Sequence, residues 1–124
     1  MTNLLNLDAI RPLQVWPDVR ARRVEGEQLT FAVVELGPNA LVPEHRHPNE
    51  QIGMVIRGRV TFTVGDETRD LAPGGTWRIL GMVPHIVKAG PDGAVVIDVF
   101  APTRSDWEAL PSLEPQPPAW PAEG

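Results

Sequence analysis

Residues 44–51 read Glu44-His45-Arg46-His47-Pro48-Asn49-Glu50-Gln51 and contain two of the three histidines in the chain. The third histidine follows downstream, in Met82-Val83-Pro84-His85. Imidazole nitrogens and amide oxygens are ligands that suit first-row divalent metals. Because all three histidines fall in two short segments, the sequence predicts one metal site inside a small β-barrel.

Composition narrows the class of protein around this cluster. The 124 residues suit one domain with one core. The chain has no cysteine, which excludes disulfides, thiolate ligands and a cysteine nucleophile. A net charge of −5 without a basic stripe argues against a nucleic-acid partner. No apolar run approaches the roughly 20 residues of a membrane span, and the N-terminus lacks a secretion signal, so we expect a cytoplasmic protein.

The apolar residues come in short β-branched runs, separated by Gly, Pro, Asn and Asp at roughly 8–12-residue intervals. This spacing predicts an all-β sandwich or barrel. The expected strands are Val19 to Glu25, Leu29 to Leu36, Gln51 to Ile56, Arg59 to Val64, Glu67 to Leu71, Thr76 to Leu80, His85 to Lys88 and Ala94 to Phe100. Short turns at Gly58 and Gly65 predict hairpins and therefore an antiparallel meander.

The last 14 residues, Pro111 to Gly124, hold five of the 14 prolines and are not expected to form a ladder. We therefore expect residues 1–110 to form a single barrel with an N-terminal arm. Residues 111–124 are expected to form an extended or disordered tail, in which Trp120 could dock on a surface. The basic run Arg20–Arg23 is interpreted as a solvated strand face or an interface edge.

Strand parity bears on the choice of metal ligands, because alternate side chains of a strand share a face. His45, His47 and Gln51 are odd-numbered, whereas Glu50 is even-numbered. If Gln51 starts an inward-facing strand, its amide is the fourth ligand beside His85. A bulge in the preceding loop would reverse this choice and select Glu50. The alternative to a metal site is that the histidines cap turns or satisfy the core.

The ligand set also constrains the chemistry. Three imidazoles and one amide oxygen suit Zn²⁺, Ni²⁺, Mn²⁺, Fe²⁺ or Cu²⁺. Without a carboxylate ligand, the ion keeps its full charge and polarises a bound oxygen more strongly. This favours Lewis-acid chemistry over stabilisation of a high-valent metal.

Two further residues are candidates for chemistry. Asp98 lies in the apolar run 94–100, where burial would raise the pKa of its carboxyl toward a range useful for proton transfer. The alternative is that Asp98 faces solvent or pairs structurally with an arginine. Arg104 follows at the expected barrel mouth, and its planar guanidinium suits a substrate carboxylate. A plain surface arginine is the alternative there.

Two segments resemble the motifs of the cupin superfamily. The first, Gly37–Gly58, contains the two neighbouring histidines and places Gln51 where a glutamate is more common. The second runs from Pro73-Gly74-Gly75 to Pro84-His85. The resemblance covers roughly residues 15 to 108. It implies an antiparallel double-stranded β-helix, or jelly-roll, barrel.

Within the cupins, Glu50-Gln51-Ile52-Gly53 and the segment Asp98–Trp107 resemble the KdgF-type proteins, which open the ring of unsaturated uronates. Asn49, Met54 and Met82 depart from the residues usual in cupins. The resemblance implies a homodimer. It also assigns roles to seven residues: metal ligands at His45, His47, Gln51 and His85, and catalytic residues at Asp98, Phe100 and Arg104.

These observations predict an enzyme that acts on a small acidic sugar or carbonyl compound. The metal would orient a substrate oxygen, Asp98 would move a proton, and Arg104 would neutralise a carboxylate. The result would be isomerisation, tautomerisation or ring opening. The same ligands could instead serve a cupin polyketide cyclase or a dioxygenase. A non-catalytic cupin that binds a sugar or an effector is the third alternative.

Overall fold

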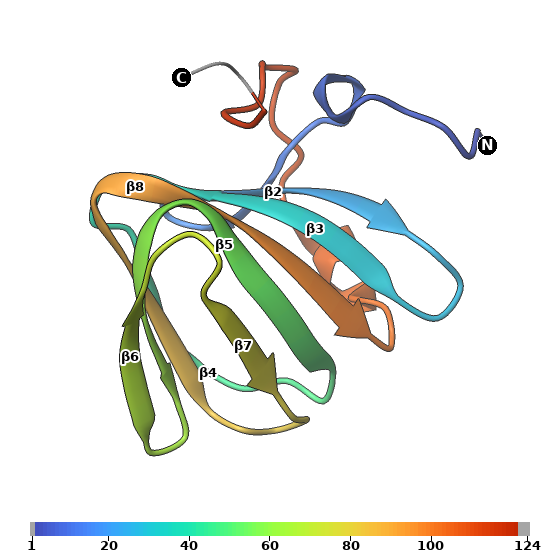
Figure 1. Cartoon of the computed structure of the whole chain (residues 1–124). Helices are drawn as coiled ribbons and strands as arrows, with labels where there is room; N and C mark the ends of the chain where they lie inside the picture. Colours follow the sequence, from blue (N-terminus) through green and yellow to red (C-terminus); the bar gives the residue numbers. More distant parts are fainter. Residues whose placement is uncertain (1, 122–124) are drawn as a thin grey trace.

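The computed structural model describes residues 2–121, and nearly all of their regular secondary structure is β-strand. Two short 3-10 helices, η1 and η2, lie near the two ends of the chain (Figure 1). The elements are η1 (Leu7–Ala9), β1 (Leu13–Trp16), β2 (Val19–Glu25), β3 (Thr30–Leu36), β4 (Leu41–His45), β5 (Glu50–Val64), β6 (Glu67–Leu71), β7 (Thr76–Ile79), β8 (His85–Ala101) and η2 (Ser105–Ala109).

The two long strands β5 and β8 hold the barrel together, because each takes part in both of its sheets. The first half of β5 pairs with the second half of β8, and β1, β2, β3 and β7 extend that sheet. The second half of β5 pairs with the first half of β8, and β4 and β6 extend the other sheet. All of these pairings are antiparallel. The fold is therefore the expected antiparallel jelly-roll barrel (Figure 1).

The continuity of β5 and β8 corrects two sequence predictions. Gly58 does not make a hairpin: its φ of 79°, with register shifts on both sides, bends one continuous strand. The break expected between the strands His85 to Lys88 and Ala94 to Phe100 is likewise a bend within β8. The hairpin at Gly65 is confirmed, since Val64 pairs with Glu67. The strands β1 and β4 were missing from the sequence prediction.

The interior of the barrel is a single apolar cluster built from both sheets. Val34, Val55 and Val96 from the first sheet face Phe62 and Val87 from the second. Each of these side chains is at least nine-tenths buried. None of the helices in the described part of the chain has the length and hydropathy of a membrane-spanning segment.

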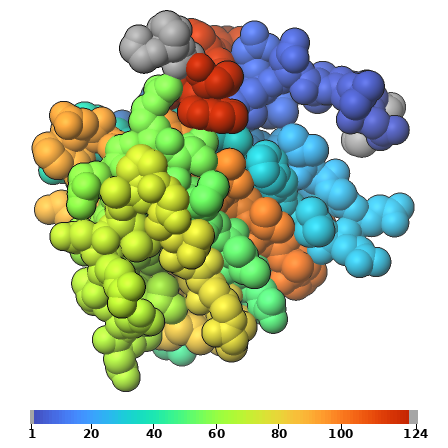
Figure 2. Space-filling view, in the orientation of Figure 1, coloured from blue at the N-terminus to red at the C-terminus, as the bar shows by residue number. Residues whose placement is uncertain are grey.

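The described part of the tail, residues 111–121, lies beside the N-terminal arm at one end of the molecule (Figure 2). The backbone N–H of Gln14 donates to Pro111 O at 3.0 Å, and that of Leu113 donates to Pro12 O at 2.8 Å. These bonds hold the tail along the edge strand β1. Trp120 is partly buried.

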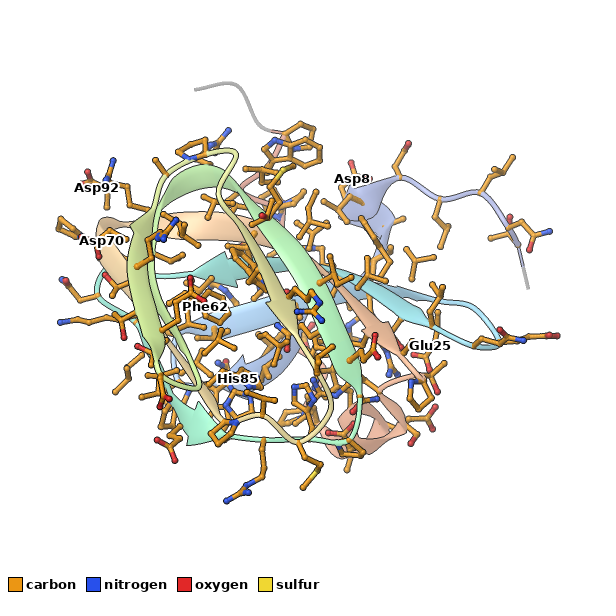
Figure 3. All side chains as sticks on the ribbon, turned by 60° about the horizontal axis from the view of Figure 1, so that its bottom comes forward. Asp8, Glu25, Phe62, Asp70, His85 and Asp92 are labelled. Atoms are coloured by element: carbon orange, nitrogen blue, oxygen red, sulfur yellow. The ribbon has the colours of Figure 1, made fainter. Side chains whose placement is uncertain are left out.

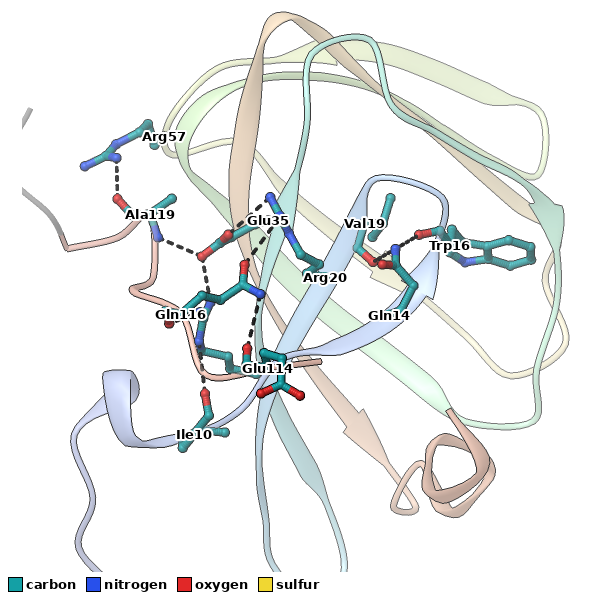
Figure 4. Close-up of polar contacts among 11 residues, drawn as sticks. Ile10, Gln14, Trp16, Val19, Arg20, Glu35, Arg57, Glu114, Gln116 and Ala119 are labelled. Atoms are coloured by element: carbon teal, nitrogen blue, oxygen red, sulfur yellow. Dashed lines mark hydrogen bonds and ion pairs between the residues drawn. The ribbon is translucent and has the colours of Figure 1, made fainter. Parts of the chain in front are cut away.

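Below the tail lies a buried ion pair between Arg22 of β2 and Glu35 of β3, with 2.8 Å between Nη1 and Oε2. Figure 4 labels Glu35 beside Ala119 of the tail. Arg22 also donates to Gln116 O at 2.8 Å, and Glu35 Oε2 accepts from the backbone N–H of Ala119 at 2.7 Å. Arg22 is only 1% exposed. The interpretation of Arg20–Arg23 as a solvated face is therefore wrong for Arg22, because the tail covers that face of the strand.

Candidate metal centre

Cross-strand register brings the three histidines together. His45, the last residue of β4, is paired directly with His85, the first residue of β8. His47 lies two residues further on, in the loop that leads to β5. One ring nitrogen from each histidine lies within 4.8 Å of the other two. Figure 3 labels His85 at this end of the barrel.

Each of these imidazoles is oriented by a backbone carbonyl two residues away in the sequence. In each case the hydrogen bond joins Nδ1 of the ring to the carbonyl oxygen. The distance is 2.9 Å for His45 with Pro43, 3.0 Å for His47 with Asn49 and 2.9 Å for His85 with Val83. A neutral imidazole that donates through Nδ1 keeps its lone pair on Nε2. This arrangement leaves Nε2 as the ligand atom, which is how metal-binding histidines are commonly held.

Burial also favours the neutral form that a metal requires. Desolvation lowers the pKa of His45 and His47 below the ordinary value. The same cause lowers the pKa of His85 to about 4. A ring that is neutral at neutral pH does not have to lose a proton before it binds a cation.

Two contacts show that the residues fit a divalent ion. The Nε2 atom of His85 is buried and has no hydrogen-bond partner among the described residues. The Nε2 atom of His47 lies 3.1 Å from Oε1 of Gln51, so two acceptors face each other when His47 donates through Nδ1. A cation shared by these atoms would satisfy both.

The structure also places Gln51 and Glu50 on opposite faces of β5. Gln51 is 7% exposed and points inward, whereas Glu50 is exposed. The Nε2 amide group of Gln51 donates to Oδ1 of Asp98 at 2.9 Å. This bond turns the amide oxygen toward His47, as a metal ligand would require.

Asp98 lies inside the barrel, 6% exposed, on the second half of β8. Its Oδ1 atom accepts from Gln51 and, at 2.7 Å, from Nε1 of Trp77. Burial raises the pKa of Asp98 to about 6, although both hydrogen bonds and the nearby Arg104 act in the opposite direction. Asp98 therefore does not face solvent, and among the described residues it forms no ion pair with an arginine.

Trp77 was not among the residues singled out from the sequence. It pairs across β5 and β7 with Gly53, which in turn pairs with Asp98. A Cβ on Gly53 would overlap both the indole nitrogen and the carboxylate. The glycine in the middle of a strand was the available signal, since such residues often mark a close approach.

Arg104 is also buried, which excludes the surface-arginine alternative. Its guanidinium lies over Phe100, 4.6 Å from the ring centroid, and over Trp107 at 4.7 Å. Its Nε and Nη2 atoms donate to the two carboxylate oxygens of Asp106, each at 3.0 Å. Hydrogen bonding to Arg104 lowers the pKa of the Asp106 carboxyl. Asp106 is a second site residue that the sequence prediction did not include.

Asn49 ties the histidine loop to the segment that carries Arg104. Its side-chain Nδ2 donates to Pro102 O at 2.6 Å and to Thr103 O at 3.1 Å. The side chain is buried. Asn49, one of the residues that depart from the usual cupin pattern, thus fixes the distance between the histidine loop and the segment that carries Arg104.

Most of the residues described above line one cavity of about 280 Å³; Asn49 and Trp77 do not. His47 does not line it but contacts the ring of Phe100, with 5.8 Å between the centroids. The other six residues predicted from the sequence line the cavity directly: His45, Gln51, His85, Asp98, Phe100 and Arg104.

Comparisons with known proteins agree with this fold. Among solved structures, the chain is similar to an RmlC-like cupin from Shewanella frigidimarina (18% identity, TM-score 0.80, covering 86% of this chain and 96% of that one). KdgF from a Halomonas species has 25% identity, a TM-score of 0.78, and coverage of 86% and 98%. The polyketide cyclase RemF from Streptomyces resistomycificus has 21% identity, a TM-score of 0.71, and coverage of 82% and 80%.

No curated protein matches the chain by sequence. The family model described as "Cupin domain" matches residues 32–100, which is more than half of the chain and includes all three histidines. The chain therefore belongs to the cupin domain family.

Proposed function

We propose that this cupin is a metal-dependent enzyme that moves a proton on a small substrate bearing a carboxylate and a carbonyl or hydroxyl group. The reaction is an isomerisation, a tautomerisation or a ring opening. One observation carries this proposal: the amide of Gln51 faces His47 through its oxygen and donates through its nitrogen to the buried carboxylate of Asp98. A Lewis-acid site and an acid/base group are thus adjacent.

His45, His47, His85 and Gln51 would hold the ion. When bound, a divalent ion supplies Lewis-acid polarisation of a substrate oxygen, for which Zn²⁺, Ni²⁺, Mn²⁺, Fe²⁺ and Cu²⁺ are candidates. The remaining work falls to side chains of this chain.

Asp98 is the proposed general acid/base. Both hydrogen bonds that hold its carboxylate go to Oδ1, so Oδ2 is available to exchange a proton with the substrate. A carboxyl with a pKa of about 6 can both donate and accept a proton near neutral pH. Arg104 holds the substrate carboxylate, and the ring of Phe100 supports its guanidinium.

The likeness to KdgF supports the choice of reaction class. The motif resemblance described above implies ring opening of an unsaturated uronate. The pairing of one carboxylate-binding arginine with one buried carboxyl is consistent with that chemistry.

The replacement Asp98→Asn tests the proposal, with metal content measured by elemental analysis and turnover assayed on unsaturated galacturonate. We expect activity to be abolished and metal content to be unchanged. The control Glu50→Gln changes a carboxylate on the outward face of β5 and should leave both quantities unchanged. Retained activity in Asp98→Asn would contradict the proposal.

The rival functions give different results in the same preparation. A dioxygenase consumes O₂, which an oxygen electrode detects. A non-catalytic sugar- or effector-binding cupin gives a ligand-dependent rise in melting temperature without any product.

We also propose that the chain acts as a cytoplasmic homodimer. Light scattering on the purified protein tests the oligomeric state, with a mass near twice the 13.6 kDa of the chain expected.

A further inference from the structure

The polar groups of the cavity are confined to one end. They are the side chains of His45, Gln51, His85, Asp98, Arg104 and Asp106. The rest of the wall is apolar and runs into the body of the barrel, through Val34, Val96 and Phe62. Phe62 is labelled with His85 in Figure 3.

This distribution has a consequence for any ligand that fills the cavity. A hydroxyl group placed against valine or phenylalanine loses its bonds to water and gains no partner. Each such hydroxyl lowers affinity by roughly tenfold. A hydrocarbon group in the same position gains affinity from its burial. The apolar wall therefore selects against polyhydroxylated ligands.

At the polar end of the cavity, the guanidinium of Arg104 keeps N–H groups with which it can bind an anion. Asp106 uses the Nε and Nη2 edge of Arg104. Among the described residues, no hydrogen bond uses Nη1 of Arg104. A carboxylate can therefore bind at that edge without displacing Asp106.

Size sets a further limit. A volume of about 280 Å³ lies near the lower end of the usual range for small-molecule sites, ~300–1,000 Å³. The cavity therefore suits a ligand of about one ring with its substituents.

Resting on the function proposed above for Arg104 and the metal centre, we propose that the substrate is a small carboxylic acid with an apolar body. Its oxygens gather at the metal end, and its hydrocarbon part enters the barrel against Val34 and Val96. Saturated hexuronates, whose hydroxyls surround the ring, are poorer ligands. The unsaturated uronate of the Asp98→Asn assay lacks one of those hydroxyls, and we expect it to be a weakly bound but usable substrate. Specificity thus resides in the apolar wall.

Two ring carboxylates of similar size test this inference directly: cyclohexanecarboxylate and galacturonate, which differ chiefly in ring hydroxyls. Binding to the purified chain is followed by calorimetry and by tryptophan fluorescence, since Trp16 and Trp107 line the cavity. We expect cyclohexanecarboxylate to bind at least tenfold more tightly. The neutral cyclohexanecarboxamide should bind more weakly than the acid, and Arg104→Gln should remove that difference.

Two threonine variants at neighbouring positions of β3 test whether the apolar wall of the cavity causes the preference between the two carboxylates. Val34→Thr places a hydroxyl in the cavity wall and should narrow the preference between the two carboxylates severalfold. Val33→Thr makes the same change at a buried position of β3 that does not line the cavity, so it should leave the preference unchanged.

Equal or tighter binding of galacturonate would overturn this inference, as would the failure of cyclohexanecarboxylate to bind. Neither result bears on proton transfer by Asp98, which the Asp98→Asn assay tests separately. Conversely, a catalytically unaffected Asp98→Asn variant with the expected binding preference would overturn the proposed reaction and leave the ligand class standing.

Discussion

At the scale of single residues, the carboxyl of Asp98, which we propose as the acid/base group, depends on the donors that hold it. Trp77 and Gln51 both donate to the same oxygen of Asp98, and each bond stabilises the charged form. The indole N–H therefore sets both the direction and the proton affinity of the carboxyl. We describe Trp77 as a positioning residue, because it acts through Asp98.

The replacement Trp77→Phe keeps an aromatic ring against Phe62 and removes the donor. We expect the pKa of Asp98 to rise further, so the acid limb of the pH–rate profile should shift to higher pH. Loss of one hydrogen bond to a charged group should lower kcat/KM roughly tenfold. A lower rate with an unshifted pH profile would show that Trp77 is only a packing residue.

The clustering of the three histidines could be predicted at this scale, whereas the position of Trp77 could not. Three histidines in two short segments are a strong local signal, and strand parity separates Gln51 from Glu50. The role of Trp77 depends instead on the register that places it beside Gly53, across from Asp98. That register is set by two long-range pairings, which no local pattern encodes.

At the scale of elements, the bends in β5 and β8 decide how the two sheets meet. Gly58 of β5 and Gly93 of β8 both have positive φ, and a Cβ on Gly58 would overlap the carbonyl oxygen of Gly93. The two bends therefore pack directly on each other. From sequence, a glycine that bends a strand and one that reverses the chain look alike, and for this reason the two long strands were each predicted as two.

The packing of these bends can be tested with a pair of glycine substitutions. Gly58→Ala should lower the free energy of unfolding by about 3 kcal/mol, because it combines an unfavourable φ with overlap of a backbone oxygen. Gly74 also has a positive φ, 95°, but no atom lies within 4 Å of the Cβ that an alanine would add. Gly74→Ala should therefore lower the free energy of unfolding by about 1 kcal/mol. Urea denaturation measures both, and equal losses would contradict the close approach.

At the scale of the whole molecule, the histidine cluster links the stability of the metal-free protein to pH. Burial lowers the pKa of all three histidines in the folded state, so the unfolded chain binds more protons below pH 6.5. Stability should therefore fall as the pH decreases from 7 toward about 4. The raised pKa of Asp98 acts in the opposite direction, because its folded form binds a proton more readily.

Melting temperatures of the chelated protein between pH 7 and pH 5 check this balance. We expect the melting temperature to decrease toward pH 5, since the lowered pKa values of three histidines outweigh the raised pKa of one carboxyl. The decrease should be steeper in Asp98→Asn, which lacks the compensating proton uptake. A melting temperature that rises toward pH 5 in the chelated Asp98→Asn variant would contradict the assigned shifts.

The tail contacts the sheet at the ion pair of Arg22 with Glu35. Substitutions there test whether the tail stays packed on the barrel. Among the described residues, Arg22→Met leaves the buried Glu35 with Arg20, at 3.7 Å, as its one remaining ion-pair partner, so we expect a loss of about 3 kcal/mol in unfolding free energy. Arg23→Met, on the same strand, removes a more exposed pair with Glu25 and should cost less than about 1 kcal/mol. Similar losses in urea denaturation would mean that the tail does not seal Arg22 from water in solution.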